Sequence, residues 1–126
     1  MPVQYPLGII KEHEQCRASA SLFDVSHMGQ IFIAGNDRLR LLERTTVGTV
    51  QSIGWWIVGK HKDDLYQCYL TLFLNEEAGI IDDAIVCVQD NQERIKIIVN
   101  AANKYTIMEH FIHVSRKELY DVKIKL

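Results

Sequence analysis

Two β-rich runs, residues 66–74 and 80–88, constrain the fold more than any other feature of this sequence. The five residues between them, 75–79, are mostly polar and end in glycine, which is typical of the connection in a β-hairpin. A polar turn leads into a third run, 94–99, in which charged and apolar residues alternate as on a half-solvated strand. The sequence therefore predicts three consecutive antiparallel strands.

Helical segments lie on both sides of these strands. Apolar residues at helical spacing predict helices over residues 7–20, from 36 or 37 to 44, and over 101–114. Glycine-bounded or alternating stretches predict further strands at 29–35 and 120–126. Helices interspersed with antiparallel strands indicate an α+β fold, an antiparallel sheet with helices packed on one face.

The length of 126 residues predicts a single domain spanning 1–126. Residues 45–64 match no clear element, because glycines interrupt the apolar part and a fully polar run follows. A structureless loop of this length is uncommon in a small domain. We therefore interpret residues 50–64 as an insertion, either an extended loop or an added hairpin.

The composition excludes several classes of function. A formal net charge of −2 offers neither a basic surface for nucleic acid nor a polybasic membrane patch. No apolar run reaches the roughly 20 residues of a membrane-spanning helix. Cys16, Cys68 and Cys87 are odd in number and lack CxxC spacing, which argues against a disulfide framework or zinc site and for a reducing compartment. We expect all three to be small core residues.

Two adjacent aspartates are the first candidates for chemistry. Asp82 and Asp83 follow each other on a predicted strand, so their side chains should point to opposite faces of the sheet. A carboxylate on the buried side needs a hydrogen-bond donor, or its pKa rises. Such a group can orient or accept a proton from a ligand nitrogen. The alternative is that both carboxylates are solvated at the start of a strand.

Three other sites carry weaker signals. Met28, before the 29–35 strand, is typical of ordinary packing, and Asn100 is suited to cap the helix that follows it. His110 and His113 have a spacing that permits a metal on a helix, but no cysteine or acidic triad completes a site.

Two segments resemble the aminomethyltransferases, the T-proteins of the glycine cleavage system. Residues 24–28 read Asp-Val-Ser-His-Met, and residues 79–83 read Gly-Ile-Ile-Asp-Asp after an Asn-Glu pair, in the order the family has them. Similar segments begin the chain and follow Val99, so the resemblance runs from 1 to about 103, except between 50 and 64. Ala78 stands where the family has glycine, which matters only if that position needs a positive φ.

The resemblance implies a catalytic role for Asp83, because the family's second aspartate is hydrogen-bonded to the folate nitrogen that receives the one-carbon unit. It further implies that Met28, Leu70 and Asn100 contact tetrahydrofolate. A thioether suits a flat pterin ring, and an amide can both donate and accept at its edge. We expect Asp83 to lie on the sheet face that bears Met28.

The reaction that the resemblance implies moves the aminomethyl carbon from the lipoyl arm of the H-protein to tetrahydrofolate and releases ammonia. The implied partners are therefore the lipoylated H-protein and folate, with neither nucleic acid nor a membrane. The expected compartment is the mitochondrial matrix in a eukaryote and the cytoplasm otherwise.

Two other interpretations stay open. Full-length family members are much longer, and the glutamate and arginine that grip the cofactor lie in later domains, so this chain corresponds to a first lobe. It could be a truncated, non-catalytic lobe that binds folate or a partner. It could also be a folate-binding protein of iron–sulfur maturation. A lobe of this kind should expose an apolar patch, and its candidate members are Trp55, Trp56, Phe111 and Ile112.

Overall fold

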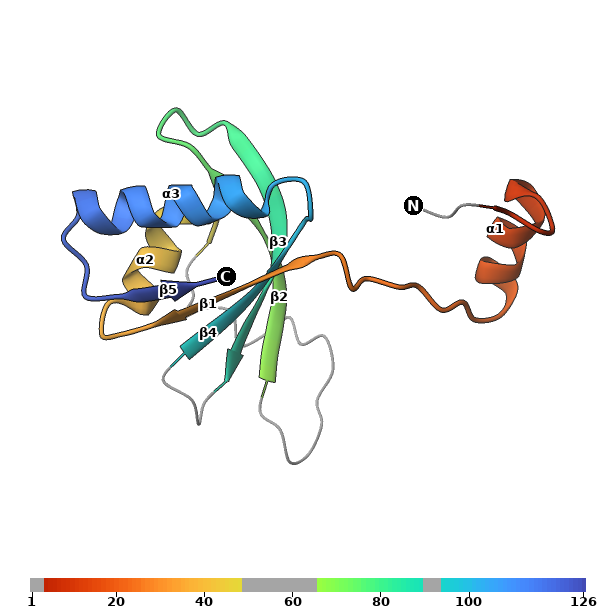
Figure 1. The fold of residues 1–126 in the computed structure, drawn as a ribbon, viewed down its shortest axis with the longest axis horizontal. Coiled ribbons are helices and arrows are strands. Elements are labelled where there is room, and N and C mark those ends of the chain that lie inside the picture. Colours follow the sequence, from red (N-terminus) through yellow and green to blue (C-terminus); the bar gives the residue numbers. More distant parts are fainter. Residues whose placement is uncertain (1–3, 49–65, 90–93) are drawn as a thin grey trace.

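A computed structural model describes residues 4–48, 66–89 and 94–126. The elements follow the order helix, strand, helix, three strands, helix, strand, which are α1 Ile9–Ala18, β1 Gly29–Ala34, α2 Arg38–Thr45, β2 Tyr66–Leu74, β3 Ile80–Gln89, β4 Arg94–Val99, α3 Lys104–Lys117 and β5 Lys123–Lys125. The five strands form one sheet in the order β2-β3-β4-β1-β5 (Figure 1). All its pairings are antiparallel, which confirms the predicted α+β fold.

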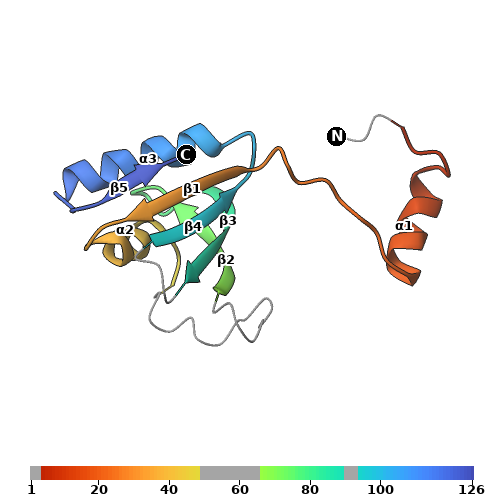
Figure 2. The same cartoon turned by 60° about the horizontal axis from the view of Figure 1, so that its bottom comes forward.

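The core lies between the sheet and two helices, α2 and α3, that cover one of its faces (Figure 2). The strands supply alternate residues to it, such as Ile31, Ile33, Ile95 and Ile97, as period-two strands with one buried face should. The predicted stripe of α3 is correct, because Ile107, Phe111 and Val114 are all buried. Phe111 therefore cannot belong to an exposed patch, as the sequence interpretation had proposed. Ile112 is half-buried.

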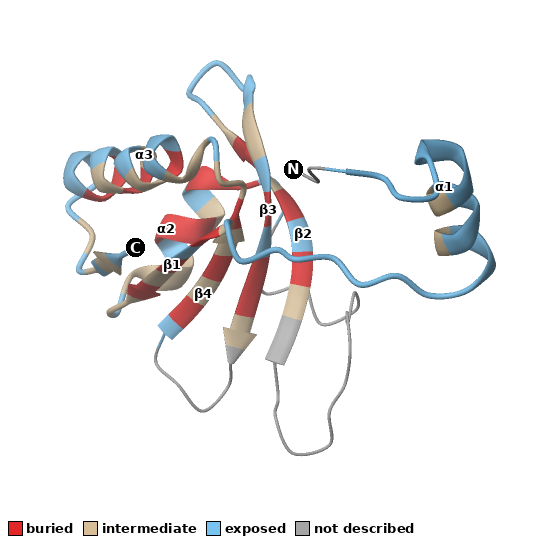
Figure 3. Cartoon of the chain, turned by 45° about the vertical axis from the view of Figure 1, so that its right-hand side comes forward, coloured by how far each residue is buried: buried red, intermediate tan, exposed pale blue. Residues whose placement is uncertain are grey.

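Helix α1 lies apart from the sheet, joined to β1 by an extended segment (Figure 1). None of its residues is buried, and Figure 3 shows it almost wholly exposed. Apolar side chains of this region are left in solvent, among them Leu7, Ile9, Ile10, Leu22 and Phe23. The exposed apolar surface that the sequence predicts is therefore present. It consists of residues in and around α1, and of strand residues such as Leu70 and Ile85. Trp55 and Trp56, like the interpreted insertion at 50–64, are outside the described residues.

The β2–β3 connection depends on the side chain of Asn75. Its Oδ1 accepts the backbone N–H groups of Gly79 at 2.6 Å and Glu77 at 3.1 Å. The main-chain N–H of Asn75 donates to the Gly79 carbonyl oxygen at 2.9 Å, which closes the loop. Ala78 has a φ of 60°, so this position does need the left-handed conformation that favours glycine.

We expect the substitution Ala78→Gly to raise the free energy of unfolding by about 0.5–1 kcal/mol, because it removes the left-handed strain of an L-residue. Urea unfolding followed by circular dichroism measures the change. Ala34→Gly in strand β1 is the matched control, and it should lower the free energy of unfolding by a similar amount. Equal losses in the two variants would contradict the role assigned to the backbone of Ala78.

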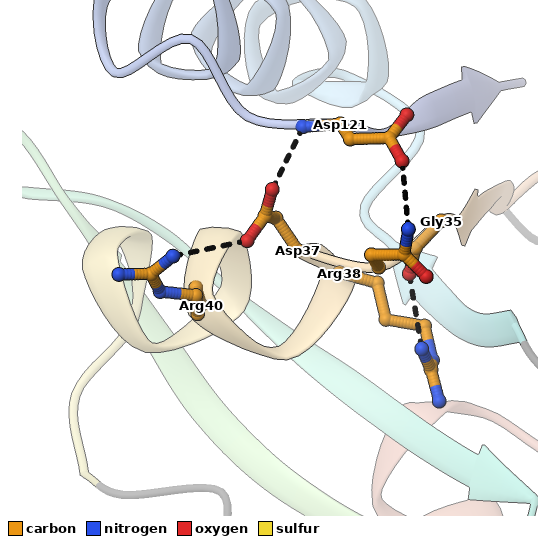
Figure 4. Close-up of polar contacts among 6 residues, drawn as sticks. Gly35, Asp37, Arg38, Arg40 and Asp121 are labelled. Atoms are coloured by element: carbon orange, nitrogen blue, oxygen red, sulfur yellow. Dashed lines mark hydrogen bonds and ion pairs between the residues drawn. The ribbon is translucent and has the colours of Figure 1, made fainter.

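A polar cluster attaches the segment before β5 to the start of α2 (Figure 4). Asp37 Oδ2 accepts the backbone N–H of Asp121 at 2.9 Å, and Oδ1 accepts Arg40 Nη1 at 3.1 Å. Asp37 is the N-cap residue of α2, yet its side chain makes no capping bond, because the carboxylate is taken up by these two donors. The Asp121 N–H, and secondarily Arg40, hold the pKa of Asp37 below its ordinary value.

The same corner requires a glycine. Gly35 has a φ of +117°, and a Cβ there would lie 2.3 Å from the carbonyl oxygen of Asp121. The two backbone segments thus pass each other too closely for any side chain.

Among the described residues, no helix is both long enough and apolar enough to cross a membrane.

Candidate functional site

The candidate site lies on the face of the sheet opposite the core, which we call the open face and define by Leu70, Leu72, Asp83, Ile85 and Ile98. In β3 the side chains of Ala84 and Val86 are buried with the core, so their neighbours Asp83 and Ile85 point to the other side. The strand register places Leu72 opposite Asp83, Leu70 opposite Ile85, and Ile85 opposite Ile98.

The open face is apolar around one charge. Leu70 is 68% exposed and Ile85 38%, and the Asp83 side chain is also exposed. Exposed branched side chains on a sheet cost free energy unless something covers them. This surface therefore offers an apolar platform next to a carboxylate.

Asn100 holds the carboxylates at the edge of this platform. Its Nδ2 donates to Asp83 Oδ1 at 3.0 Å and to Asp82 Oδ1 at 3.0 Å, and it lies 3.4 Å from the Asp83 carbonyl oxygen. The prediction that the two side chains point to opposite faces agrees with a half-buried Asp82 and an exposed Asp83, yet one amide binds both. Asn100 directly follows the last residue of β4, so it lies just outside the β3–β4 ladder. The β2–β3 register also shifts beside Asp82. At this irregular end of the sheet, one amide reaches both carboxylates.

Asp82 remains charged at neutral pH. Burial raises the pKa of its carboxyl group, but hydrogen bonds to the carboxylate lower it by more, and the bond from Asn100 contributes the largest share of this lowering. The pKa of Asp82 therefore lies below its ordinary value. The amide of Asn103 adds to the lowering, yet Asp82 Oδ2 has no partner at hydrogen-bond distance among the described residues. One oxygen of Asp82 is therefore a buried acceptor that the described residues leave unpaired.

Met28 lies at the same end of the sheet. It directly precedes Gly29, which pairs with Val99, so its backbone is next to that of Asn100. Its N–H donates to the Val25 carbonyl oxygen at 3.0 Å, and its side chain is half-buried. Of the four residues selected from the sequence, Asp83 and Asn100 are in contact. Met28 precedes β1 at the same end of the sheet, whereas Leu70 lies in the middle of the edge strand β2, opposite Ile85.

Asn100 does not cap the following helix. The N-cap residue of α3 is Asn103, three residues later. Instead, the carbonyl oxygen of Asn100 accepts the N–H of Asn103 at 3.2 Å in a turn that precedes the helix. This turn leaves the Asn100 side chain free to bind the two aspartates.

The histidines of α3 have no metal-binding set of neighbours among the residues that the structure describes. Burial, and secondarily the charge of His113, lowers the pKa of His110, whose ring borders a small cavity of about 30 Å³ with Glu76 and Lys117. Within residues 4–48, 66–89 and 94–126, no three His, Cys, Asp or Glu side chains are grouped to hold a metal ion.

Reasoning from the sequence missed two parts of the site. Asp82 was a candidate for chemistry beside Asp83, but its hydrogen bond with the amide of Asn100 was not foreseen. Ile85 and Ile98 were not selected as the apolar floor beside Asp83, although strand parity could have found Ile85, two residues along the same strand. The partnership with Ile98 needs the β3–β4 register, which no local signal provides.

The chain is similar to known proteins over nearly all its length. The family model of the GCVT N-terminal domain matches residues 1–125. The mitochondrial aminomethyltransferase of Dictyostelium discoideum is 41% identical over 101 residues, covering 80% of this chain and 22% of that protein. The aminomethyltransferase of Rubrobacter xylanophilus is 36% identical over 126 residues, 100% of this chain and 29% of that protein.

A solved structure has the same fold. The glycine cleavage system aminomethyltransferase T from Bartonella henselae superposes with a TM-score of 0.74 at 30% identity, covering 98% of this chain and 31% of that one. This chain thus spans less than a third of the length of each of these three relatives.

Proposed function

The chain belongs to the family of the GCVT N-terminal domain, and we propose that it is the folate-facing lobe of an aminomethyltransferase of the glycine cleavage system. In this role it takes part in moving the one-carbon unit from the aminomethyl-lipoyl arm of the H-protein to tetrahydrofolate, with release of ammonia. The observation that carries the proposal is the pair of carboxylates held by Asn100 at the edge of an exposed apolar sheet face.

The residues present fit a reduced pterin. Its ring is flat and edged with N–H groups, and the open face offers exposed aliphatic side chains beside carboxylate oxygens. Asp82 Oδ2 is a buried acceptor whose partner is not among the described residues. Asp83, Asn100, Leu70 and Met28 would hold the ligand, as the family resemblance implies.

Each residue has a separate task in this proposal. Tetrahydrofolate, when bound, supplies the nitrogen that accepts the one-carbon unit. Asp83 orients that nitrogen and can take up its proton, which a charged carboxylate within hydrogen-bond reach can do. Asn100 keeps the Asp83 carboxylate in place, so less of its freedom is lost when the ligand binds. Leu70 and Ile85 support the ring and exclude water from one side.

The identity of the donor and the compartment rest on the family. We propose the lipoylated H-protein as the partner, in the mitochondrial matrix of a eukaryote or in bacterial cytoplasm. A non-catalytic, folate-binding lobe is the second candidate, since the chain spans under a third of its relatives. The named relatives are aminomethyltransferases, which favours this branch over a protein of iron–sulfur maturation.

Folate binding tests the proposal directly. Titration of the chain with tetrahydrofolate under anaerobic conditions should give weak binding, about one to two orders of magnitude below that of a full-length relative that also grips the cofactor tail. Leu70→Asp adds a further carboxylate to the open face and removes its most exposed apolar side chain, so the affinity for tetrahydrofolate should fall at least about tenfold.

Leu22→Asp is the matched control for this titration. Leu22 is fully exposed and lies on the segment between α1 and β1, away from the open face. Its variant should bind tetrahydrofolate as the parent chain does. If both variants bind equally, or the parent chain does not bind at all, the open face is not a folate surface.

A further inference from the structure

Two of the three cysteines meet across the sheet. Cys68 in β2 and Cys87 in β3 are paired directly in the antiparallel register, and their Sγ atoms are 2.8 Å apart. Both are free thiols. They are 19 residues apart along the chain, so only the hairpin register brings them together. Of the three cysteines expected to be small core residues, only Cys87 is buried, and the expectation is wrong for Cys16, which lies on the unpacked helix α1.

The backbone geometry at this pair suits a disulfide. Facing residues of an antiparallel ladder have Cα atoms about 4.5–5.5 Å apart, within the range of about 4.4–6.8 Å that a disulfide accepts. The two Cβ–Sγ bonds already point toward each other, because the sulfur atoms are in contact. A bond between them would therefore need only small side-chain movements and no change in strand pairing.

We propose that Cys68 and Cys87 form a thiol–disulfide redox site, at which a low-molecular-weight disulfide such as oxidised glutathione cross-links β2 to β3. The thiolate of Cys68 attacks one sulfur of the oxidant, forms a mixed disulfide and releases one reduced thiol. The deprotonated sulfur of Cys87 then attacks Cys68 Sγ, forms the intramolecular bond and releases the second. Two electrons pass to the oxidant, and both protein thiols lose their protons.

The surroundings set this order of attack. Cys87 is 7% exposed, whereas Cys68 is half-buried, so a bulky oxidant reaches Cys68 first. Burial, and then the neighbouring Cys68, raises the pKa of Cys87 to about 12, which makes it a poor first nucleophile. Lys96 pairs with Cys87 from strand β4, and its positive charge favours the thiolate once Cys68 has reacted.

The bond would lie on the open face. Cys87 follows Ile85 by two residues and Cys68 precedes Leu70 by two, so all four side chains lie on the same side of the sheet. Cross-linking would fix the two strands that carry Leu70 and Asp83. The proposal concerns the thiols alone and does not depend on folate binding.

Treatment of the folded, reduced chain with oxidised glutathione tests it. In the Cys16→Ser variant, which lacks the third thiol, the number of free thiols should fall from two to none, with loss of mass equal to two hydrogen atoms. Non-reducing peptide mapping should join the peptides of Cys68 and Cys87. Cys16→Ser should leave the linkage unchanged, Cys87→Ser should stop at a glutathione adduct on Cys68, and Cys68→Ser should leave Cys87 unmodified.

The same treatment of the urea-unfolded chain is the reference, because there all three thiols are accessible and the linkage should be scrambled. A linkage in the folded chain that includes Cys16 would overturn the proposal. A stable glutathione adduct on Cys68 of the parent chain, with Cys87 still reduced, would overturn it as well.

Discussion

Replacing Asp83 by Asn is expected to lower one-carbon transfer to tetrahydrofolate by about 10²–10⁴-fold, the usual contribution of a positioned general acid or base. The substitution keeps the shape of the side chain and removes its charge, so it can no longer take up a proton. Folate affinity should change little, because the apolar platform of Leu70 and Ile85 is intact. The loss should therefore appear in kcat rather than in KM.

The assay needs a complete enzyme around the lobe. The chain can be grafted in place of the matched third of the Bartonella henselae aminomethyltransferase, with which it shares its fold, and assayed with lipoylated H-protein and tetrahydrofolate. Asp82→Asn is the matched control, and it should have the smaller effect. If Asp83→Asn kept normal turnover while Asp82→Asn abolished it, the choice between the two adjacent aspartates would be wrong.

The largest loss of stability is expected for Phe73→Ala, at about 3–5 kcal/mol. Phe73 is completely buried, and its ring meets that of Phe111 edge-to-face, with centroids 5.2 Å apart at 86°. Truncation removes the ring, leaves a cavity and deletes the aromatic contact between β2 and α3. Domains of this size have only about 5–15 kcal/mol of stability in total, so much of the variant should unfold at modest urea concentrations.

Phe23→Ala provides the comparison for Phe73→Ala. The Phe23 side chain is 70% exposed on the segment between α1 and β1, so its loss should change the free energy of unfolding by less than about 0.5 kcal/mol. Both values come from urea unfolding monitored by circular dichroism. Equal losses in the two variants would mean that the core is not built around Phe73 and Phe111.

Local patterns predicted most elements of this fold. The alternation of β2, β3 and β4 and the polar turn at 75–79 are period-two signals that need no tertiary information. The observed ends of the helices and strands differ by a few residues from those predicted. The helix expected at 101–114 runs over Lys104–Lys117, because a turn with an Asn100–Asn103 hydrogen bond precedes it. Helix ends depend on such caps, which the apolar stripe does not specify.

The sequence by itself determined the fold class, the hairpin and, through its family motifs, the selection of Asp83, Asn100, Leu70 and Met28. Only the tertiary structure decided which of these groups touch one another. Asn100 binds both aspartates because the β3–β4 register brings residues 17 and 18 positions apart together. The register of β2 and β3 likewise joins Cys68 to Cys87. Register depends on long-range pairing of whole strands, so the spacing of a single segment cannot show it.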